Sequence, residues 1–402
     1  MTIVRPFKAI RPTRDKANLV ASRSYLTYSD KTIKEKLDHN PYTFLHIINP
    51  DYNNKKKATG IAKFKLVKEK FKQFISNGIL EKDNVASFYI YQKKDRLNTF
   101  TGIIGASSVS DYLNNNIKRH EQTISKREEM FCHYLETTGF NADPVLLAHE
   151  PNKKIENILN RYTSMRSEYE FTTTNKSLHK LWIVNNKNDI TSIQNTFAKI
   201  NNVYIADGHH RCASSALLSK NKNSNSSSYF MSYLIDENQL RILNFNRLVK
   251  NLNGLESCKL LEKIQESYTV TNKQENTWIP NQEYEISMYL NGKWYSLIAN
   301  PEKYDSTADS LDPSILSRKI LKPILNITDE RTSKNISFLD GTIPLSTIKE
   351  KVDSGEYTAG FILKPISINA IKQVADNNEI MPPKSTYVEP KLRSGLTIYP
   401  IQ

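Results

Sequence analysis

The chain has few cysteines and no long apolar run. Its 402 residues include only Cys132, Cys212 and Cys258, which form no CxxC pair. This excludes a disulfide framework and a cysteine-based zinc site, and it is typical of the reducing cytosol. No apolar run approaches the ~20 residues that cross a bilayer, and the N-terminus MTIVRPFKAIRPTRDK carries charges where a signal peptide is apolar. We expect a cytoplasmic protein with no membrane partner.

Glycine is also scarce, with 12 in the whole chain. The sequence contains no GxxxxGK[ST] P-loop, no GxGxxG, no kinase-type glycine loop and no GxSxG nucleophile elbow. A conventional cradle for a nucleoside triphosphate is therefore hard to place. No internal repeat is present, which argues against a solenoid.

Positive charge is abundant: 56 lysines and arginines against 42 acidic residues give a net charge of +14. A basic surface attracts nucleic acid, acidic membranes or phosphate compounds, and charge alone does not choose among them. The lysines are spread along the chain, often beside asparagine, as in NNKKK (53–57) and KNKNSNSSS (220–228). We interpret most of this charge as solvated surface.

The hydrophobic pattern predicts a mixed α/β fold with antiparallel hairpins. An amphipathic helix ends before Gly78, and a second helix, at about 126–138, has a capping-box pattern at Ser125 and Glu128 and ends at Gly139. Strands are expected at 86–91, 99–106, 181–184 and 203–206, hairpins at 229–243 and around Asn291-Gly292, and helices at 152–166, 212–219, 313–322 and 367–376. The expected organisation is a catalytic region over 1–245, an α+β region over 246–380, and a basic tail over 381–402 that folds back on the site.

The strongest local signal is YIADGHHRCASSAL. A buried strand stops at Asp207, Gly208 makes the turn, and a helix follows whose N-terminal N–H groups and dipole favour phosphate. Arg211 offers a planar fork to phosphate oxygens, and His209 and His210 can donate to phosphate or carry protons. Asp207 can hold Mg²⁺ or a substrate amine. The alternative is a plain Asp-Gly turn with surface histidines, and four reactive side chains around one glycine argue against it.

A second signal is IKRHEQT (117–123). His120 and Glu121, beside Lys118 and Arg119, form a possible acid/base unit in which the carboxylate accepts a hydroxyl proton and the cations manage phosphate charge. By itself, a His-Glu pair in a basic segment is more often solvated surface.

A third signal is KSTYVEPKLRSG (384–395). Its hydroxyls and cations, including Lys391, Arg393 and Ser394, suit oxyanion binding. Composition alone leaves this interpretation and an ordinary basic tail equally open.

Six segments occur in order along the chain: RPFKAIRP, NPYTFLHIINP, DYLNNNIKRHEQT, YIADGHHR, LRILNFNR and MPPKSTYVEPKLRSG. Together they resemble a long-uncharacterised family, and the DGHHR region is similar to that of archaeal free-serine kinases. The resemblance implies a mixed α+β fold with a ParB/sulfiredoxin-like core and a further hairpin-rich region. It also implies transfer of a phosphoryl group to the hydroxyl of free L-serine, giving O-phospho-L-serine.

The same resemblance implies roles for individual residues. Glu121 would be the general base, with His120 beside it, and Asp207 would act in catalysis and hold Mg²⁺. The resemblance implies phosphate or donor binding by Gly208, His209, His210 and Arg211. The tail residues Lys391, Arg393 and Ser394 match a family signature, and their role in phosphate binding is inferred from their chemistry. Substrate contacts are expected from Arg119, Thr123 and Arg127.

The chain departs from the family pattern in two segments. ASRSYLT (21–27) has Arg23 where relatives have proline, and TISKREEMF (123–131) replaces a more acidic, aspartate-containing stretch.

The missing nucleotide cradle favours inorganic pyrophosphate as the phosphoryl donor, with ADP or ATP as the alternative. A ParB-like nucleic-acid-binding regulator is the competing class, but it predicts a helix-turn-helix after the core, where the pattern shows hairpins instead. A sulfiredoxin-type reductase needs cysteine inside the turn, where this chain has His209. We therefore expect L-serine and pyrophosphate, and no nucleic acid, as partners.

Overall fold

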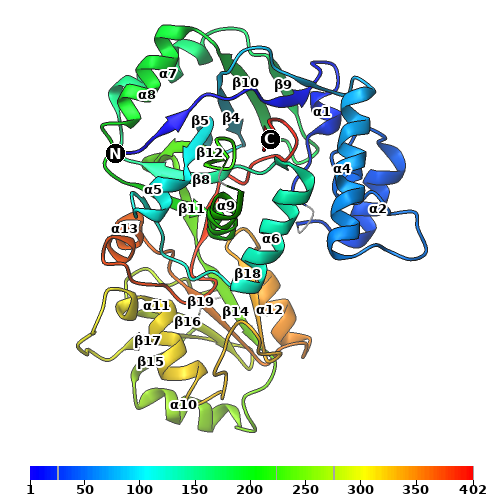
Figure 1. The fold of residues 1–402 in the computed structure, drawn as a ribbon. Helices are drawn as coiled ribbons and strands as arrows, with labels where there is room; N and C mark the ends of the chain where they lie inside the picture. Colours follow the sequence, from blue (N-terminus) through cyan, green and yellow to red (C-terminus); the bar gives the residue numbers. More distant parts are fainter. Residues whose placement is uncertain (25–26, 223, 275–276, 402) are drawn as a thin grey trace. The chain divides into compact units, whose positions relative to one another are not determined.

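The computed structural model describes residues 1–24, 27–222, 224–274 and 277–401. The chain forms two compact units (Figure 1). The first unit contains Met1–Arg119, Thr123–Leu240 and Pro390–Gln402, and the second contains His120–Gln122 and Arg241–Glu389. The boundary expected after residue 245 thus falls at Leu240, and the expected tail is divided between the units after Glu389.

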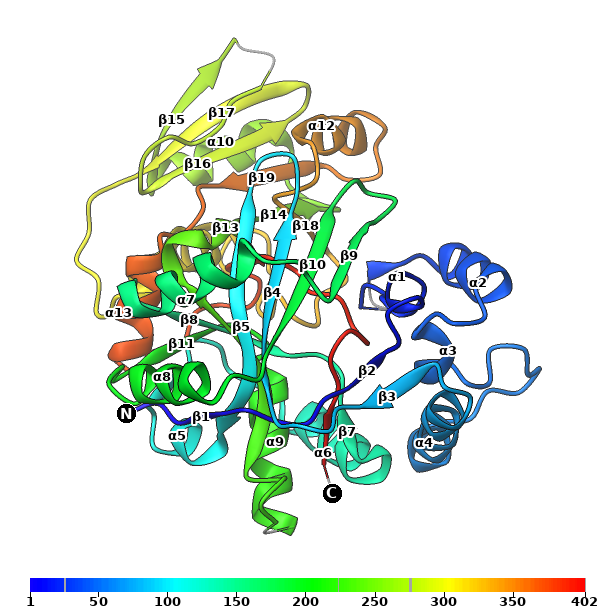
Figure 2. The same ribbon diagram turned by 90° about the horizontal axis from the view of Figure 1, so that it is seen from above.

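The first unit is built on a nine-stranded mixed sheet with the order β6-β11-β8-β12-β5-β4-β10-β9, to which β1 adds on β5. Two pairs, β6/β11 and β8/β12, are parallel, and the other neighbours are antiparallel. Figure 2 shows β5, β4, β10 and β9 side by side. The strands are β1 (Val4–Arg5), β4 (Phe88–Lys94), β5 (Thr99–Ser108), β6 (Ile117–Lys118), β8 (Val145–His149), β9 (Tyr169–Thr172), β10 (Leu178–Val184), β11 (Val203–Asp207) and β12 (Tyr229–Asp236).

Two short ribbons complete this unit. They pair β2 (Ile10–Pro12) with β3 (Leu80–Lys82), and β7 (Phe140–Asn141) with β21 (Tyr399–Pro400). The second pairing joins the end of the chain to its middle.

The clearest amphipathic helix of the first unit is α7, which buries Ile155, Ile158, Leu159 and Tyr162 on one face. The main core joins the sheet to α5, α7, α8 and α9, and a second core lies under α3 and α4. The helices are α1 (Ala17–Val20), α2 (Asp30–His39), α3 (Leu45–Ile48), α4 (Gly60–Ser76), α5 (Val109–Leu113), α6 (Ser125–Thr138), α7 (Lys153–Thr163), α8 (Lys187–Phe197) and α9 (His209–Lys222).

The second unit is built on a six-stranded antiparallel sheet with the order β15-β17-β16-β19-β14-β18. The central strand β16 is buried on both faces: Ile286, Met288 and Leu290 join the core of α10 and α11, whereas Tyr289 joins the core of α12. The strands are β14 (Phe245–Val249), β15 (Tyr268–Lys273), β16 (Glu285–Leu290), β17 (Lys293–Ala299), β18 (Ile336–Asp340) and β19 (Ala359–Leu363).

A short ribbon, β13 (Arg241–Leu243) with β20 (Tyr387–Glu389), and four helices complete the second unit. The helices are α10 (Ser257–Gln265), α11 (Asp312–Leu316), which continues as a π-helical turn, α12 (Leu345–Asp353) and α13 (Ile368–Asp376). In the part of the chain that the structure describes, no helix combines the length and apolar character needed to cross a bilayer.

The expected mixed α+β class is confirmed, and two local predictions are wrong. The predicted hairpin between 229–235 and 240–243 does not form, because β13 pairs with β20 instead of β12. The capping box does not form either: Ile124 precedes α6 without a side-chain cap, and Ser125 is already helical. Gly139 ends this helix with a left-handed φ of 76°, as predicted.

Candidate active site

The turn between β11 and α9 is fixed by Gly208. β11 lies between β6 and β8 in the sheet, and it ends at Asp207. Gly208 has a φ of +106°, a conformation that other residues rarely adopt. A Cβ at this position would also lie 2.9 Å from Nε of Arg211. Backbone conformation and the close approach of the arginine therefore both require glycine here.

Asp207 binds two cations that come from different parts of the sequence. Nη2 of Arg211 donates to its Oδ2 at 2.7 Å, and Nζ of Lys391 donates to its Oδ1 at 3.0 Å. Burial alone would raise the pKa of Asp207, but Lys391 and Arg211 lower it to about 2. The carboxylate is therefore ionised at neutral pH. All three side chains remain partly exposed to solvent, and that of Asp207 is 38% exposed.

Arg211 is also held by a second hydrogen bond, which its other terminal nitrogen donates. Its Nη1 donates to the backbone carbonyl of Pro144, in the loop between β7 and β8. Two of the five N–H groups of the guanidinium thus fix its position over Gly208, and the side chain remains 29% exposed.

The two histidines of the motif begin α9. His209 is buried, with 5% of its surface exposed, and His210 is half-buried. The first N–H groups of a helix have no intrahelical acceptor, and they lie at the positive end of the helix dipole. The turn therefore presents backbone donors beside Arg211 and Lys391, an arrangement suited to phosphate.

The three tail residues expected at the donor site make different contacts. Lys391 contacts Asp207, Nη2 of Arg393 donates to Oδ1 of Asn175 at 3.1 Å, and the Ser394 hydroxyl donates to Asp143. The structure therefore brings only Lys391 of these three into contact with the Asp207 carboxylate.

The His-Glu pair belongs to the second unit. His120 is 1% exposed, and its carbonyl accepts a hydrogen bond from the backbone N–H of Met381 at 2.9 Å. Glu121 is half-buried.

The residues expected to contact substrate belong to the first unit. The exposed Arg119 lies over the ring of Tyr112, 5.9 Å from its centroid. Thr123 precedes α6, and Arg127 is exposed in its first turn. Within the described residues, none of the three side chains contacts Asp207 or Arg211.

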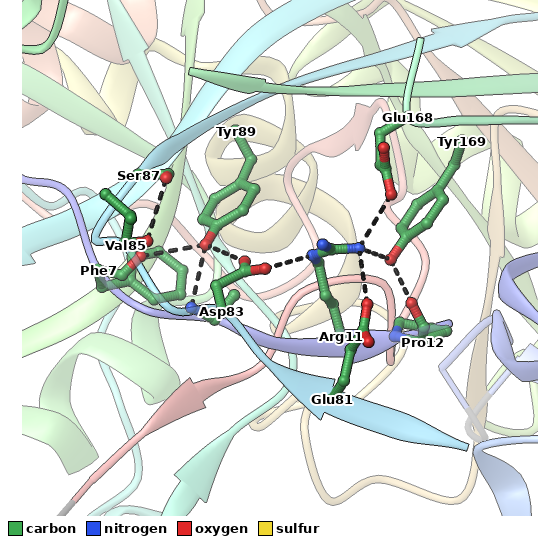
Figure 3. A network of polar contacts seen from close by, with 11 residues as sticks. Phe7, Arg11, Pro12, Glu81, Asp83, Val85, Ser87, Tyr89, Glu168 and Tyr169 are labelled. Carbon is green, nitrogen blue, oxygen red and sulfur yellow. Dashed lines mark hydrogen bonds and ion pairs between the residues drawn. The ribbon is translucent and has the colours of Figure 1, made fainter. Parts of the chain in front are cut away.

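The RPFKAIRP motif has a structural role in this unit (Figure 3). Nε of Arg11 donates to Asp83 at 2.7 Å, and its Nη1 contacts Glu168 at 3.2 Å and the Tyr169 hydroxyl at 2.7 Å. The Tyr89 hydroxyl donates to the second oxygen of Asp83 at 2.7 Å. This network joins β2, β4 and β9 and leaves the Arg11 guanidinium committed to protein partners.

Asp207 can serve as one ligand of Mg²⁺. This ion is commonly held by one or two carboxylates while substrate phosphates and water complete its coordination. Each oxygen of Asp207 accepts one hydrogen bond from a cationic side chain, and a carboxylate oxygen has a second lone pair that can bind a metal ion.

Sequence patterns reveal part of this geometry. Asp207 through Arg211 are contiguous and can be recognised as a strand–turn–helix motif. Pro144 was missed because it acts through its backbone carbonyl, which has no residue-specific signal. The contact between Lys391 and Asp207 joins residues 184 positions apart, and only the fold shows it.

The fold and this turn define a mixed α+β protein with a candidate phosphate-binding strand–glycine–helix element. The family described as protein of unknown function, DUF1015, matches residues 4–314. Because the match covers most of the chain, the protein belongs to this family.

Solved structures give weaker matches. One is a mutant free serine kinase in complex with AMP, with 13% identity, a TM-score of 0.41, and coverage of 74% of this chain and 91% of that chain. A conserved hypothetical protein from Pyrococcus furiosus has 14% identity and a TM-score of 0.36, covering 74% and 94%. C-terminally truncated SbnI from Staphylococcus aureus has 15% identity and a TM-score of 0.39, covering 74% and 87%. No curated protein matches the chain. At these values the structural likeness carries no functional information.

Proposed function

We propose that the protein transfers a phosphoryl group to the hydroxyl of free L-serine, giving O-phospho-L-serine. The observation that carries this proposal is the convergence of Arg211 and Lys391 on Asp207, at a glycine turn that opens a helix. The choice of L-serine as acceptor rests on the similarity of the DGHHR region to that of archaeal free-serine kinases.

The chemistry of phosphoryl transfer suits these groups. The reaction asks the protein mainly to position the reactants and to neutralise charge on the transferred group. Arg211, Lys391 and the first N–H groups of α9 supply charge-assisted donors to phosphate oxygens. The serine oxygen forms the new P–O bond while the bond from phosphorus to the leaving phosphate breaks. We assign the acceptance of the hydroxyl proton to the Glu121 carboxylate.

For the donor we propose inorganic pyrophosphate, with ADP or ATP as the alternative. Pyrophosphate needs only oxyanion contacts, whereas a nucleotide also needs an apolar slot and partners for its ribose. Mg²⁺ is the proposed cofactor, with Asp207 as a protein ligand. When bound, it would neutralise charge on the phosphate oxygens.

The test of the site is Arg211→Lys. Lysine keeps the charge but loses the planar fork, so kcat/KM for O-phosphoserine formation should fall at least about tenfold, or about 1.4 kcal/mol. Arg161→Lys is the matched control, because Arg161 is 55% exposed and its carboxylate partner is Asp189, not Asp207. Thermal melting of both variants shows whether the fold is intact. Turnover of a folded Arg211→Lys variant equal to that of wild type would make the motif structural.

A further inference from the structure

A second group of cations lies where the tail meets the N-terminal segment. Ser22 and Ser394 form an antiparallel bridge, with reciprocal backbone hydrogen bonds of 3.3 and 2.9 Å. In such a bridge, the residue after Ser22 lies opposite the residue before Ser394. Arg23, which is exposed, is therefore placed across from Arg393, which is partly buried. Like charges directly opposite each other are destabilising unless something of opposite charge joins them.

The partners of Arg393 do not neutralise it. Its Nη2 donates to the amide oxygen of Asn175, a neutral group. Burial lowers the pKa of Arg393, Tyr28 and Tyr91 counteract this, and Arg23 lowers the pKa further. The two arginines thus carry two positive charges, and the partners named here, Asn175, Tyr28 and Tyr91, are all neutral.

Both arginines lower the pKa of a buried histidine. His179 is 1% exposed, and its ring is stacked between Phe171 and Tyr91, with centroids 5.3 and 6.0 Å away. In the sheet it stands opposite Lys93 on β4. Burial lowers the pKa of His179 to about 3, and Arg393, Lys93 and Arg23 all act in the same direction. The ring is neutral at physiological pH, and every charge that shifts its pKa is positive.

The two ring nitrogens of His179 differ in their contacts. Nδ1 lies 2.6 Å from the Tyr91 hydroxyl. When that hydroxyl donates its proton to Nδ1, the neutral ring carries its own proton on Nε2. Nε2 is buried and has no hydrogen-bond partner among the described residues. An unsatisfied buried donor costs about 1–3 kcal/mol, which a ligand acceptor would recover.

Lys93 has an acidic neighbour in the adjacent turn: burial raises the pKa of Asp95, and the backbone N–H groups of Leu97 and Asn98, together with the charge of Lys93, lower it. The excess positive charge is therefore concentrated at the two arginines.

We propose that Arg23, Arg393 and Nε2–H of His179 form an oxyanion site that binds a phosphate group. Arg393 follows Lys391 by two residues, so the two positions are at most about 7 Å apart along the backbone. A diphosphate can therefore place one phosphate against Lys391 and Arg211 and its other phosphate against Arg23 and Arg393. This assignment to the distal phosphate of the donor rests on the proposed function, whereas anion binding at the site does not.

The test is calorimetric titration of the full chain with pyrophosphate, with inorganic phosphate and with L-serine, each alone. Arg23→Gln and Arg393→Gln should each raise the Kd for pyrophosphate at least about tenfold. Arg331→Gln, which removes an exposed arginine in the second unit, is the control and should leave the Kd unchanged. Arg23 is exposed, so its variant tests the site without a folding defect.

The outcomes separate this site from the proposed activity. If Arg23→Gln and Arg393→Gln bind pyrophosphate as wild type does, the site is wrong, even where wild type phosphorylates serine. Loss of L-serine affinity with unchanged pyrophosphate affinity also overturns it, because the arginines would then bind a carboxylate. If both variants lose pyrophosphate while wild type makes no O-phosphoserine, the anion site stands and the serine-kinase proposal fails.

Discussion

At the scale of single residues, the candidate site depends on how one carboxylate is shared. Asp207 orients Arg211 and Lys391, and its ionised form is secured by both cations, which hold its pKa at about 2. A phosphate that binds to these cations competes with Asp207 for their hydrogen bonds. The sequence predicted that residues would share this site where they are contiguous, as in DGHHR. Arg23, His179 and Arg393 were not recognisable as a group, because no local pattern links three separated positions.

Glu121→Gln tests the proposed base. The substitution removes the proton acceptor but keeps the shape of the side chain, so the rate of O-phosphoserine formation should fall about 10²- to 10⁴-fold. Pyrophosphate affinity should be unchanged. Glu129→Gln, on the exposed side of α6, is the control. Only a mild loss in Glu121→Gln would assign the base elsewhere, and His120 would be the next residue to test.

At the scale of elements, the Arg11 network should stabilise the first unit strongly. The side chains of Arg11 and Asp83 are only 10% and 11% exposed. Arg11→Met leaves the Asp83 carboxylate buried without its cation, so the free energy of unfolding should fall by about 3 kcal/mol or more. Urea denaturation measures this change.

Lys72→Met is the control for the Arg11 variant, because the Lys72–Glu69 pair, with side chains 60% and 61% exposed, should contribute less than about 1 kcal/mol. The double variant Arg11→Met/Asp83→Asn should recover part of the loss, since it removes the stranded charge. Equal effects of Arg11→Met and Lys72→Met would contradict the structural role of the network.

A second element-scale prediction concerns Asp312, the first residue of α11. Its Oδ1 accepts a hydrogen bond from the backbone N–H of Tyr284 at 2.9 Å, but burial raises its pKa to about 7. The unfolded chain loses this proton near pH 4. Between about pH 4 and 7 the unfolded state therefore binds fewer protons than the folded state, and stability falls as pH rises, by up to ~4 kcal/mol.

The measurement compares urea midpoints at pH 5 and pH 8. Wild type should be less stable at pH 8, and Asp312→Asn, which keeps the acceptor oxygen without the charge, should lose most of that difference. An identical pH dependence in both proteins would show that other groups cause it.

Element predictions succeeded where the signal was local. The hairpin of β16 and β17 was predictable because Asn291 and Gly292 both take the positive φ that a tight hairpin turn needs, 47° and 77°. The wrong hairpin joined segments that are close in sequence, whereas β13 pairs with β20, which lies far along the chain. Pairing of distant segments depends on packing that no short window contains.

At the scale of the whole molecule, the chain passes between its two units several times, which is why a single boundary near residue 245 could not describe it. Residues 120–122 belong to the second unit, although the residues on both sides of them belong to the first. Residues 390–402 belong to the first unit, although the segment before them belongs to the second. The mixed α+β class and the family were recognisable from sequence, because ordered motifs span most of the chain.

The central claim is phosphorylation of free L-serine, and ³¹P NMR of the purified chain tests it most directly. L-Serine and Mg²⁺ are incubated separately with pyrophosphate, ADP and ATP. We predict O-phosphoserine with pyrophosphate, with inorganic phosphate as co-product, and much weaker turnover with ADP or ATP. Turnover with either nucleotide that equals turnover with pyrophosphate would overturn the donor assignment alone. Absence of O-phosphoserine with all three donors, from folded protein, would contradict the serine-kinase account itself.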